Sequence, residues 1–492
     1  MWRVPGRADG AADPSLAEAL GTLHARASLF DPARAVLMAR APGRLDLMGG
    51  IADYSGGLVL EFPIRQATCV FAQSCEARRL TILSLVSDGA ASSSARAPKM
   101  VSISLDALTP AAGPLEYARA RAWLGGDPER AWAAYVAGAL VVLQRERGRL
   151  LSRGANLLIH SDLPAGIGLA SSAALEVAAL ETLAALTDTP LGERELALLA
   201  QMVENLIVGA PCGVMDQLTA VAGRAGCLIE ILCQPAEARG HIPIPSALEV
   251  WGLDSGIRHA ISGADYGSVR AATFMGYRML AEEAGLAVTV DADSGRLRVD
   301  DPLFGGYPAN VSPALWRARY RDVVPVALDG ATFLERYGGT TDAATVVDPS
   351  RTYHVRACTE HPILEHERAR RFRELLSTGA TQEAGRMELG QLMYDSHASY
   401  GACGLGSDGT DRLVDLVRAA GPAAGLYGAK ITGGGSGGTV AVLARRDCGP
   451  AVVEIASRYE RETGRRCEAI TGSSPGSRAF GVRHLEPSLE TR

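Results

Sequence analysis

The sequence is poor in lysine and in aromatic residues. Its 492 residues contain two lysines, Lys99 and Lys430, and 5% aromatic residues. Neither lysine follows a glycine, so the Gly-Lys pair with which a P-loop holds phosphate is missing. The net charge is −6 and the sequence has no run of basic residues. We therefore expect neither nucleic acid nor an anionic membrane as a partner.

Long apolar segments and paired cysteine motifs are also missing. The longest apolar run, residues 131–143, is too short to cross a bilayer, and no apolar signal-peptide segment follows Met1. The nine cysteines form no Cys-x-x-Cys motif, and an odd number of cysteines is typical of free thiols in a reducing compartment. These features predict a cytoplasmic protein without structural zinc.

The length and composition predict a folded chain with more than one core. Apolar residues make up 47% of the sequence and charged residues 21%, and 492 residues exceed one ordinary core. We expect a loosely structured segment at 1–30, an N-terminal lobe at 31–245 and a C-terminal lobe at 246–492. The scattered Gly, Pro and Asp of about 286–350 indicate a loop-rich insertion in the second lobe.

A glycine-rich turn is the most informative stretch of the sequence. Residues 155–160 have the pattern of a buried strand, and residues 173–186 have the composition of a helix. Between them lie two glycines and two serines, namely Gly166, Gly168, Ser171 and Ser172. Bare backbone amides at a helix start favour an anion, so the turn predicts a phosphate site. From these residues alone, a plain strand-to-helix connector is an equal alternative.

Three glycine-bearing motifs follow one another in a fixed order. They are Pro42-Gly-Arg44, residues 164–172 and residues 432–438. This set resembles the GHMP small-molecule kinases, and the resemblance runs from about residue 36 to 480. It implies an α+β fold of two lobes, the first like ribosomal protein S5 and the second ferredoxin-like. ATP and the acceptor would bind in the cleft between the lobes.

Further stretches of the sequence resemble particular members of this family, namely its sugar kinases. Residues 211–217 and 254–270 resemble galactokinases, and residues 48–55, 209–216, 402–410 and 427–435 resemble the kinase portion of plant L-arabinokinases. The resemblance implies an ATP- and Mg²⁺-dependent sugar 1-kinase that converts L-arabinose to L-arabinose 1-phosphate. A galactokinase stays open as an alternative. A non-catalytic sugar sensor is a weaker one, because such a protein does not need the kinase residues that are present.

The resemblance assigns catalysis to Asp216 and Arg44. A sugar hydroxyl is a poor nucleophile, and a carboxylate beside it can accept its proton during phosphoryl transfer. An arginine at hydrogen-bonding distance would hold that carboxylate ionised and stabilise charge on the phosphoryl group. Whether Asp216 acts as a base or only orients and stabilises stays open from the sequence.

The resemblance also assigns the nucleotide and metal contacts. Gly166, Gly168, Ser171 and Ser172 would bind the ATP phosphates. Ser172 and Glu204 would hold Mg²⁺, which prefers oxygen ligands. For Glu204, an exposed position on a helix is the alternative.

The expected sugar contacts come from the galactokinase-like positions, namely Asp53, Gly213, Tyr266, Gly434 and Gly435. A half-buried core tyrosine is the alternative for Tyr266. Galactokinases carry Glu-His where this chain has Gly50-Ile51, and that pair contacts the C6 hydroxyl of the sugar. L-Arabinopyranose lacks the C6 hydroxymethyl group of galactose, so the departure favours the pentose.

Overall fold

The structure is a computed structural model of the whole chain. It describes residues 2–3, 14–86, 98–258, 264–291, 296–380 and 382–487. Within these ranges, no helix is long and apolar enough to cross a membrane.

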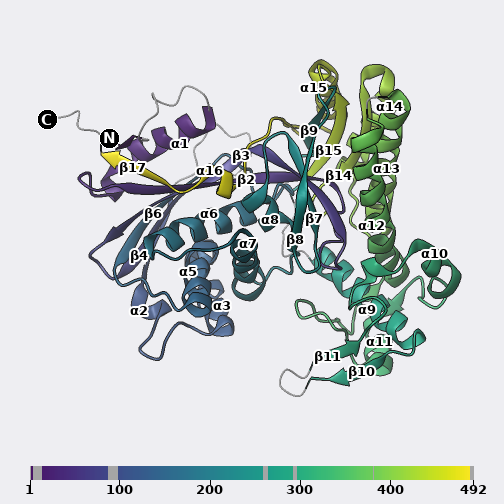
Figure 1. Ribbon diagram of the computed structural model, residues 1–492, viewed down its shortest axis with the longest axis horizontal. Helices are drawn as coiled ribbons and strands as arrows, with labels where there is room; N and C mark the ends of the chain where they lie inside the picture. The colour runs from purple at the N-terminus through teal and green to yellow at the C-terminus, as the bar shows by residue number, and fades with distance from the viewer. Residues whose placement is uncertain are drawn as a thin grey trace.

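A mixed sheet organises the N-terminal half (Figure 1). Its path runs β1-β17-β2-β3-β6-β4-β5, and β7 extends from β3 and carries β8. The strands are β1 (Trp2–Arg3), β2 (Val36–Met48), β3 (Leu58–Cys75), β4 (Arg79–Val86), β5 (Lys99–Ser104), β6 (Gly154–Ser161), β7 (Cys227–Leu232), β8 (Glu237–Pro243) and β17 (Arg483–Pro487). The long strands β2 and β3 lie at its centre and pair antiparallel, with Arg44 opposite Pro63 and Asp46 opposite Glu61.

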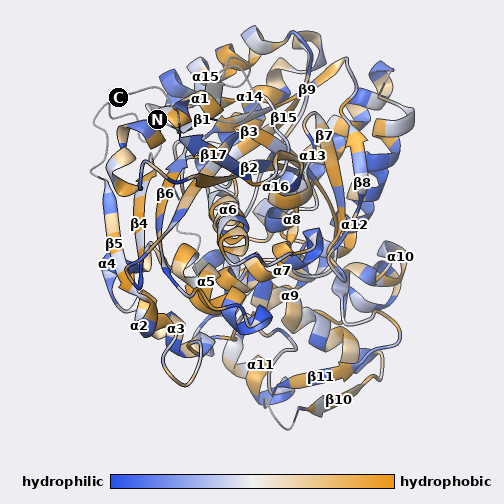
Figure 2. Cartoon of the chain, turned by 60° about the vertical axis from the view of Figure 1, so that its left-hand side comes forward, coloured by the Kyte–Doolittle hydropathy of each residue, from blue (hydrophilic) through white to orange (hydrophobic). Residues whose placement is uncertain are grey.

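Helices cover the face of this sheet that carries the glycine-rich turn. They are α2 (Leu105–Leu108), α3 (Tyr117–Gly125), α4 (Pro128–Ala131), α5 (Ala134–Arg147), α6 (Ser171–Leu186), α7 (Glu193–Met202), α8 (Met215–Ala222) and α16 (Ser477–Phe480). The helix α6 packs on β2 and β3 and is itself covered by α5 and α8. Most of its residues are buried, and its colour in Figure 2 shows that many are apolar. The expected strand at 155–160 and helix at 173–186 are therefore confirmed as β6 and α6.

The N-terminal segment is more ordered than the sequence suggested. Residues 14–25 form helix α1 (Pro14–Ala25), which packs on β3 and β6. In Figure 1 it lies on the side of the sheet opposite α6. Its buried residues Leu16, Ala19 and Leu23 recur every three or four positions, which is the spacing of one helix face. The expectation of a loose start is therefore wrong for this helix, and residues 1 and 4–13 lie outside the described ranges.

A second, antiparallel sheet forms the upper part of the C-terminal half. Its order is β14-β15-β9-β16, and helices α13 and α14 pack on β14. The strands are β9 (Leu248–Asp254), β14 (Leu426–Ile431), β15 (Thr439–Arg445) and β16 (Ala469–Ile470). The helices are α9 (Ala264–Glu283), α12 (Val355–Thr378), α13 (Glu383–Ala402), α14 (Asp408–Ala420) and α15 (Gly449–Thr463).

The insertion expected to be loop-rich contains its own packed core. It holds the hairpin β10 (Ala287–Val290) and β11 (Leu297–Asp300), helices α10 (Pro313–Leu315) and α11 (Gly330–Tyr337), and strand β12 (Leu328–Asp329), which pairs with β13 (Thr352–Tyr353). Phe304, Trp316 and Phe333 are buried together against α9 and α12. The expectation is wrong for this segment, because its apolar residues are far apart in the sequence and meet only after folding.

The division of the chain near residue 245 agrees with the change of sheet, since β8 ends at Pro243 and β9 begins at Leu248. The chain does not stay in the second half, however. Strand β17 returns to the first sheet and pairs with β2 and β1. The last described residues therefore belong to the N-terminal sheet.

Candidate active site

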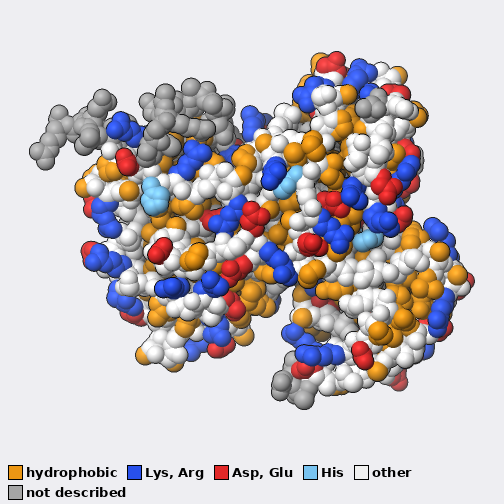
Figure 3. All heavy atoms as spheres, viewed as in Figure 1, with side chains coloured by type: hydrophobic (Ala, Val, Ile, Leu, Met, Phe, Trp, Pro, Cys, Tyr) orange, Lys and Arg blue, Asp and Glu red, His pale blue; other side chains and the backbone are white. Residues whose placement is uncertain are grey.

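A cavity opens between the two halves of the chain. Its lining is formed by the glycine-rich turn with the start of α6, by the segment from Ala210 to Asp216, and by Arg44, Asp53, Glu204, Tyr266, Gly433 and Gly434. A notch separates the left and lower right parts of the molecule in the space-filling view (Figure 3). Eleven of the twelve site residues predicted from the sequence line this cavity, and the exception is Gly435.

The glycine-rich turn delivers backbone amides to the cavity. Gly166 and Gly168 have positive φ angles of 73° and 75°, and Ala170, which precedes α6, has a φ of 59°. An added Cβ at Gly168 would lie 2.8 Å from the carbonyl oxygen of Thr432, so this glycine permits close contact with the second half. Ser171 and Ser172 begin α6, where the amides have no partner within the helix. The turn has the geometry of an anion site.

Arg44 and Asp216 form an ion pair at the cavity. Arg44 comes from β2, and Asp216 lies in the first turn of α8. The arginine donates from Nε and Nη2 to Oδ1 of Asp216 at 2.9 and 2.7 Å, and from Nη1 to the Gly168 carbonyl oxygen at 2.5 Å. The Arg44 side chain is 3% exposed and that of Asp216 is 21% exposed. The carboxylate is therefore the member of the pair that a ligand can reach.

The electrostatic surroundings keep Arg44 charged. Burial alone would lower the pKa of its guanidinium, but the charges of Asp216, Glu61 and Asp46 raise that pKa above its usual value. An arginine with this environment supplies a permanent positive charge at the cavity wall.

Glu204 lies where helix α7 passes into a π-helical turn, and its side chain is buried. It lies in η2 (Val203–Val208), a π-helical turn that directly follows α7. Its carboxylate accepts hydrogen bonds from the Ser172 hydroxyl and from Nε2 of Gln217, the latter at 2.8 Å. Because Glu204 is buried, the alternative of an exposed helix residue is excluded.

A second buried carboxyl group, Glu176, lies next to Glu204. It is on α6 one turn after Ser172, and Nε2 of Gln217 donates to it at 3.2 Å. Burial raises the pKa of both glutamates. The charge of Glu204 adds to the rise for Glu176, and the charge of Asp216 adds to it for Glu204. Neither Glu176 nor Gln217 was predicted as a site residue, although Gln217 lies inside the galactokinase-like stretch 211–217 and Glu176 lies in the helix after the glycine-rich turn.

Asp53 and Gly213 form a close contact in the cavity wall. A Cβ at position 213 would overlap with the Asp53 carboxylate, so only glycine allows this approach. Oδ1 of Asp53 is buried and has no hydrogen-bond partner among the described residues. Burial, followed by the charge of Asp216, raises the pKa of Asp53 to about 7. An unsatisfied buried carboxylate of this kind is suited to accept hydroxyl groups of a ligand.

Tyr266 and the third glycine motif close the remaining side. Tyr266 lies in the first turn of α9, with its ring edge-on to Tyr54 at 5.8 Å between centroids. Gly433 and Gly434 line the cavity beside it. Gly435 differs from expectation, because its backbone faces Leu405 and does not line the cavity.

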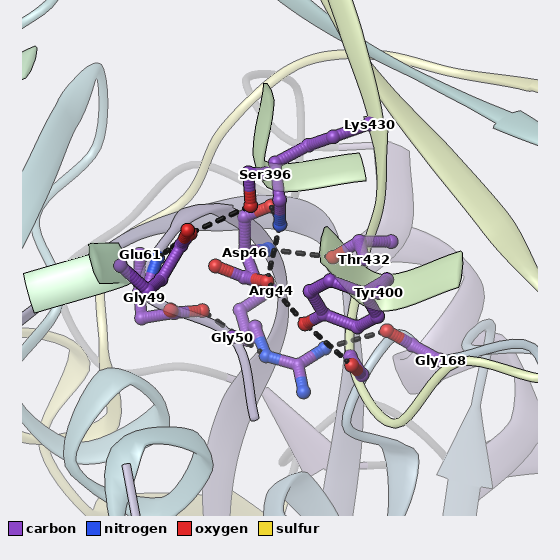
Figure 4. Close-up of polar contacts among 12 residues, drawn as sticks. Arg44, Asp46, Gly49, Gly50, Glu61, Gly168, Ser396, Tyr400, Lys430 and Thr432 are labelled. Atoms are coloured by element: carbon purple, nitrogen blue, oxygen red, sulfur yellow. Dashed lines mark hydrogen bonds and ion pairs between the residues drawn. The ribbon is translucent and has the colours of Figure 1, made fainter. Parts of the chain in front are cut away.

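A buried polar network behind Arg44 was not predicted (Figure 4). Nζ of Lys430 on β14 donates to Oδ2 of Asp46 on β2 at 2.6 Å. The Tyr400 hydroxyl on α13 lies 3.0 Å from the Gly433 carbonyl oxygen and 3.2 Å from Oδ2 of Asp46. Two signals in the sequence could have marked Lys430, namely the scarcity of lysine and its place in the stretch 427–435.

The Gly50-Ile51 pair lies next to this network. A Cβ at Gly50 would overlap with the Tyr400 hydroxyl and the Asp46 carboxylate. The Gly50 carbonyl oxygen is 2.8 Å from Nε2 of His361 on α12. Ile51 is buried in the apolar cluster with Tyr54 and Tyr400. We expected this pair on the C6 side of the sugar, but neither residue lines the cavity.

Comparisons with known proteins agree with this architecture. Family models match at residues 134–224 (GHMP kinases N terminal domain), 27–74 (galactokinase galactose-binding signature) and 379–460 (GHMP kinases C terminal). The chain is 42% identical to an L-arabinokinase of Arabidopsis thaliana over 94% of the chain and 48% of that relative, so it spans about half of the relative's length. It is 32% identical to a galactokinase of Chloroflexus aggregans over 92% of the chain and 95% of that relative.

A solved structure shares the fold. The crystal structure of Lactococcus lactis galactokinase complexed with galactose matches with a TM-score of 0.68 at 20% identity. The match covers 94% of this chain and 99% of the other. The expected α+β kinase fold is thereby confirmed.

The packing at Gly50 generates a stability prediction. Gly50→Ala should lower the free energy of unfolding by about 2–3 kcal/mol, because the new methyl group must displace Tyr400 or Asp46. Gly401→Ala, on the same helix as Tyr400 but with open space around it, is the control and should change stability by less than about 1 kcal/mol. Urea unfolding measures both variants. Equal stabilities for the two would contradict the close contact at Gly50.

Proposed function

Because this chain belongs to the GHMP kinases, in their galactokinase-like branch, we propose that it is an ATP-dependent sugar 1-kinase. We propose L-arabinose as its acceptor and L-arabinose 1-phosphate as its product. One observation carries the proposal. Asp216, paired with Arg44 at 2.7 Å, faces a cavity that has an anion site at one side and an unsatisfied carboxylate, Asp53, at another.

The chemistry follows from these residues. The anomeric hydroxyl is the most acidic hydroxyl of a free sugar, so a weak base such as Asp216 can accept its proton during transfer. The oxygen then attacks the γ-phosphorus of ATP and the bond to the β-phosphate oxygen breaks, which leaves ADP. Arg44 stabilises the negative charge of the transferring group and holds Asp216 in place. Asp53 and Tyr266, which also line the cavity, orient the sugar ring.

The nucleotide phosphates would bind to the glycine-rich turn and the first amides of α6. Magnesium fits the residues beside it, because Glu204 and Glu176 are buried carboxyl groups that repel each other and Oε1 of Glu176 has no partner. No group of three or more metal-ligating side chains occurs among the described residues. This suits an ion held by Ser172 and Glu204 together with ATP oxygens and water. When bound, the ion neutralises charge on the phosphates.

Two observations favour L-arabinose over D-galactose. Identity is 42% to the Arabidopsis L-arabinokinase and 32% to the Chloroflexus galactokinase. This chain also lacks the Glu-His pair with which galactokinases contact the C6 hydroxyl, and a glutamate could not be placed at position 50, because its Cβ would overlap with the Tyr400 hydroxyl. A C6 hydroxyl directed to this side would find no partner from these positions, which costs about 1–3 kcal/mol when the hydroxyl is buried.

A galactokinase is the second candidate. It is supported by the match to a whole galactokinase, since the chain covers 95% of the Chloroflexus protein. We also propose a cytosolic location, supported by nine cysteines that are all free thiols.

A coupled assay of ADP release over a panel of free sugars tests the proposal. We expect kcat/KM for L-arabinose to exceed that for D-galactose by about 5- to 150-fold, which corresponds to the cost of the unpaired hydroxyl. Phosphate on the anomeric oxygen is then verified by nuclear magnetic resonance. Equal efficiency with galactose would favour the galactokinase, and no turnover with any sugar would reject both enzymes.

Asp216→Asn should lower kcat by about 10²–10⁴-fold, because the amide keeps the shape of the carboxylate but cannot accept the proton. ATP affinity, measured by calorimetry, should change little. Asp106→Asn is the control, since that aspartate is exposed and paired with Arg78 far from the cavity. If Asp216→Asn kept the wild-type kcat, Asp216 would be neither the base nor an electrostatic contributor in the reaction.

Glu204→Gln should raise the Mg²⁺ concentration that gives half-maximal rate, because a neutral amide is a poorer ligand for a hard cation. Glu193→Gln, an exposed position at the start of α7, is the matched control. Sugar affinity without nucleotide should stay the same in both variants. If the Mg²⁺ titration of Glu204→Gln matches that of the wild type, Glu204 is not a ligand.

A further inference from the structure

Four charged side chains form a buried cluster beside the cavity. Arg44, Asp46, Glu61 and Lys430 are each at most 3% exposed, and of these only Arg44 lines the cavity. Arg44 and Asp46 come from β2, Glu61 from β3 and Lys430 from β14 (Figure 4). Three of the four charges are paired, because Lys430 forms an ion pair with Asp46 and Arg44 forms one with Asp216. Glu61 has none in the proposed reaction.

Glu61 is close to Arg44 but receives no hydrogen bond from it. Its Oε2 lies 3.2 Å from Nε of Arg44. That nitrogen carries one hydrogen, which it donates to Oδ1 of Asp216 at 2.9 Å. Both carboxyl oxygens of Glu61 are therefore without a hydrogen-bond partner among the described residues. An ionised carboxylate buried in this way loses its hydration without replacement, which is costly.

A like charge stands directly across the sheet from Glu61. Asp46 is its partner in the β2–β3 register, and side chains in such a pair lie about 5 Å apart at Cβ. Oδ2 of Asp46 accepts from Lys430, whereas Oδ1 of Asp46 has no partner. One proton on Glu61 would pair two of these three oxygens, because a protonated Glu61 can donate to Oδ1 of Asp46.

We propose that Glu61 is a positioning residue that carries a proton in the active enzyme, donates it to Asp46, and thereby leaves the charge of Arg44 to Asp216. The proposal rests on the sugar-kinase function proposed above. With Glu61 neutral, the two cations Arg44 and Lys430 are balanced by the two anions Asp46 and Asp216. With Glu61 ionised, the group would carry a net negative charge where a polyphosphate must bind.

The surrounding charges agree with this assignment. Burial raises the pKa of Glu61 well above its usual value, and the charges of Asp46 and Asp216 outweigh the opposing effects of Arg44 and Lys430. The other titratable groups that face it are the Tyr400 hydroxyl on α13 and the Cys233 thiol after β7. The pKa values of both are raised, first by burial, so they add no negative charge near neutral pH.

Three variants test the proposal. Glu61→Gln mimics the protonated acid, since its amide can donate to Asp46, whereas Glu61→Ala removes the group. Glu230→Gln, a carboxyl on the neighbouring strand β7 that pairs with Arg373, is the control. We expect Glu61→Gln to keep kcat within about threefold of wild type at neutral pH and Glu61→Ala to lose about tenfold or more. In Glu61→Ala, the fold increase in KM for ATP should be smaller than the fold decrease in kcat.

The pH dependence separates a protonated from an ionised Glu61. If the neutral acid is the working form, the ratio of kcat for Glu61→Gln to that of the wild type stays level or rises with pH. A ratio that falls with pH means that the ionised carboxylate is needed and overturns the proposal. A loss of kcat in Glu61→Gln as large as in Glu61→Ala overturns it as well.

An infrared difference spectrum provides a readout that needs no turnover. Subtracting the spectrum of Glu61→Gln from that of the wild type at neutral pH should reveal the C=O stretch of a protonated carboxyl group. Absence of this band overturns the proposal, even if the kinetics agree. If the wild type phosphorylates no sugar, the proposed function fails, but the spectrum still decides whether Glu61 holds a proton.

Discussion

The Arg44 guanidinium is the group on which the geometry of the cavity depends. It donates to Asp216 at the start of α8 and to the Gly168 carbonyl in the turn before α6. A guanidinium is planar and its donors point in fixed directions, so these partners cannot move independently of one another. The acceptor carboxylate and the anion site are therefore fixed relative to β2. That arrangement is what a phosphoryl transfer between two bound substrates requires.

A second constraint joins the two halves of the chain. Lys430 from the C-terminal sheet and Asp46 from the N-terminal sheet form a buried ion pair at 2.6 Å. Such a pair adds little net stability, because both charges lose their hydration. Misplacing either partner would leave an unpaired charge in the interior, so the pair selects one relative position of β2 and β14. The Gly433 loop, which follows Lys430 and contacts Tyr400, takes its place at the cavity as a result.

Local elements could be predicted from the sequence, and contacts between distant segments could not. The strand β6 and the helix α6 are marked by short apolar patterns, and Asp216 by its motif. Glu61 lies in an ordinary strand sequence, and its importance arises only because Asp46 is opposite and Arg44 adjacent. The insertion was mistaken for loops because Trp316 and its partners are far apart in sequence. The Gly50-Ile51 pair, expected beside the sugar, does not line the cavity, because a position in a motif does not fix where a side chain points.

The central claim is that Asp216 meets the anomeric hydroxyl of the sugar while the start of α6 holds the phosphates. A crystal structure with L-arabinose and a non-hydrolysable ATP analogue tests it most directly. We expect the anomeric oxygen within about 2.6–3.2 Å of the Asp216 carboxylate and in line with the terminal phosphorus. We also expect the terminal phosphate beside Arg44 and Ser172. A sugar bound with its anomeric hydroxyl away from Asp216, and another hydroxyl in that place, would contradict the claim.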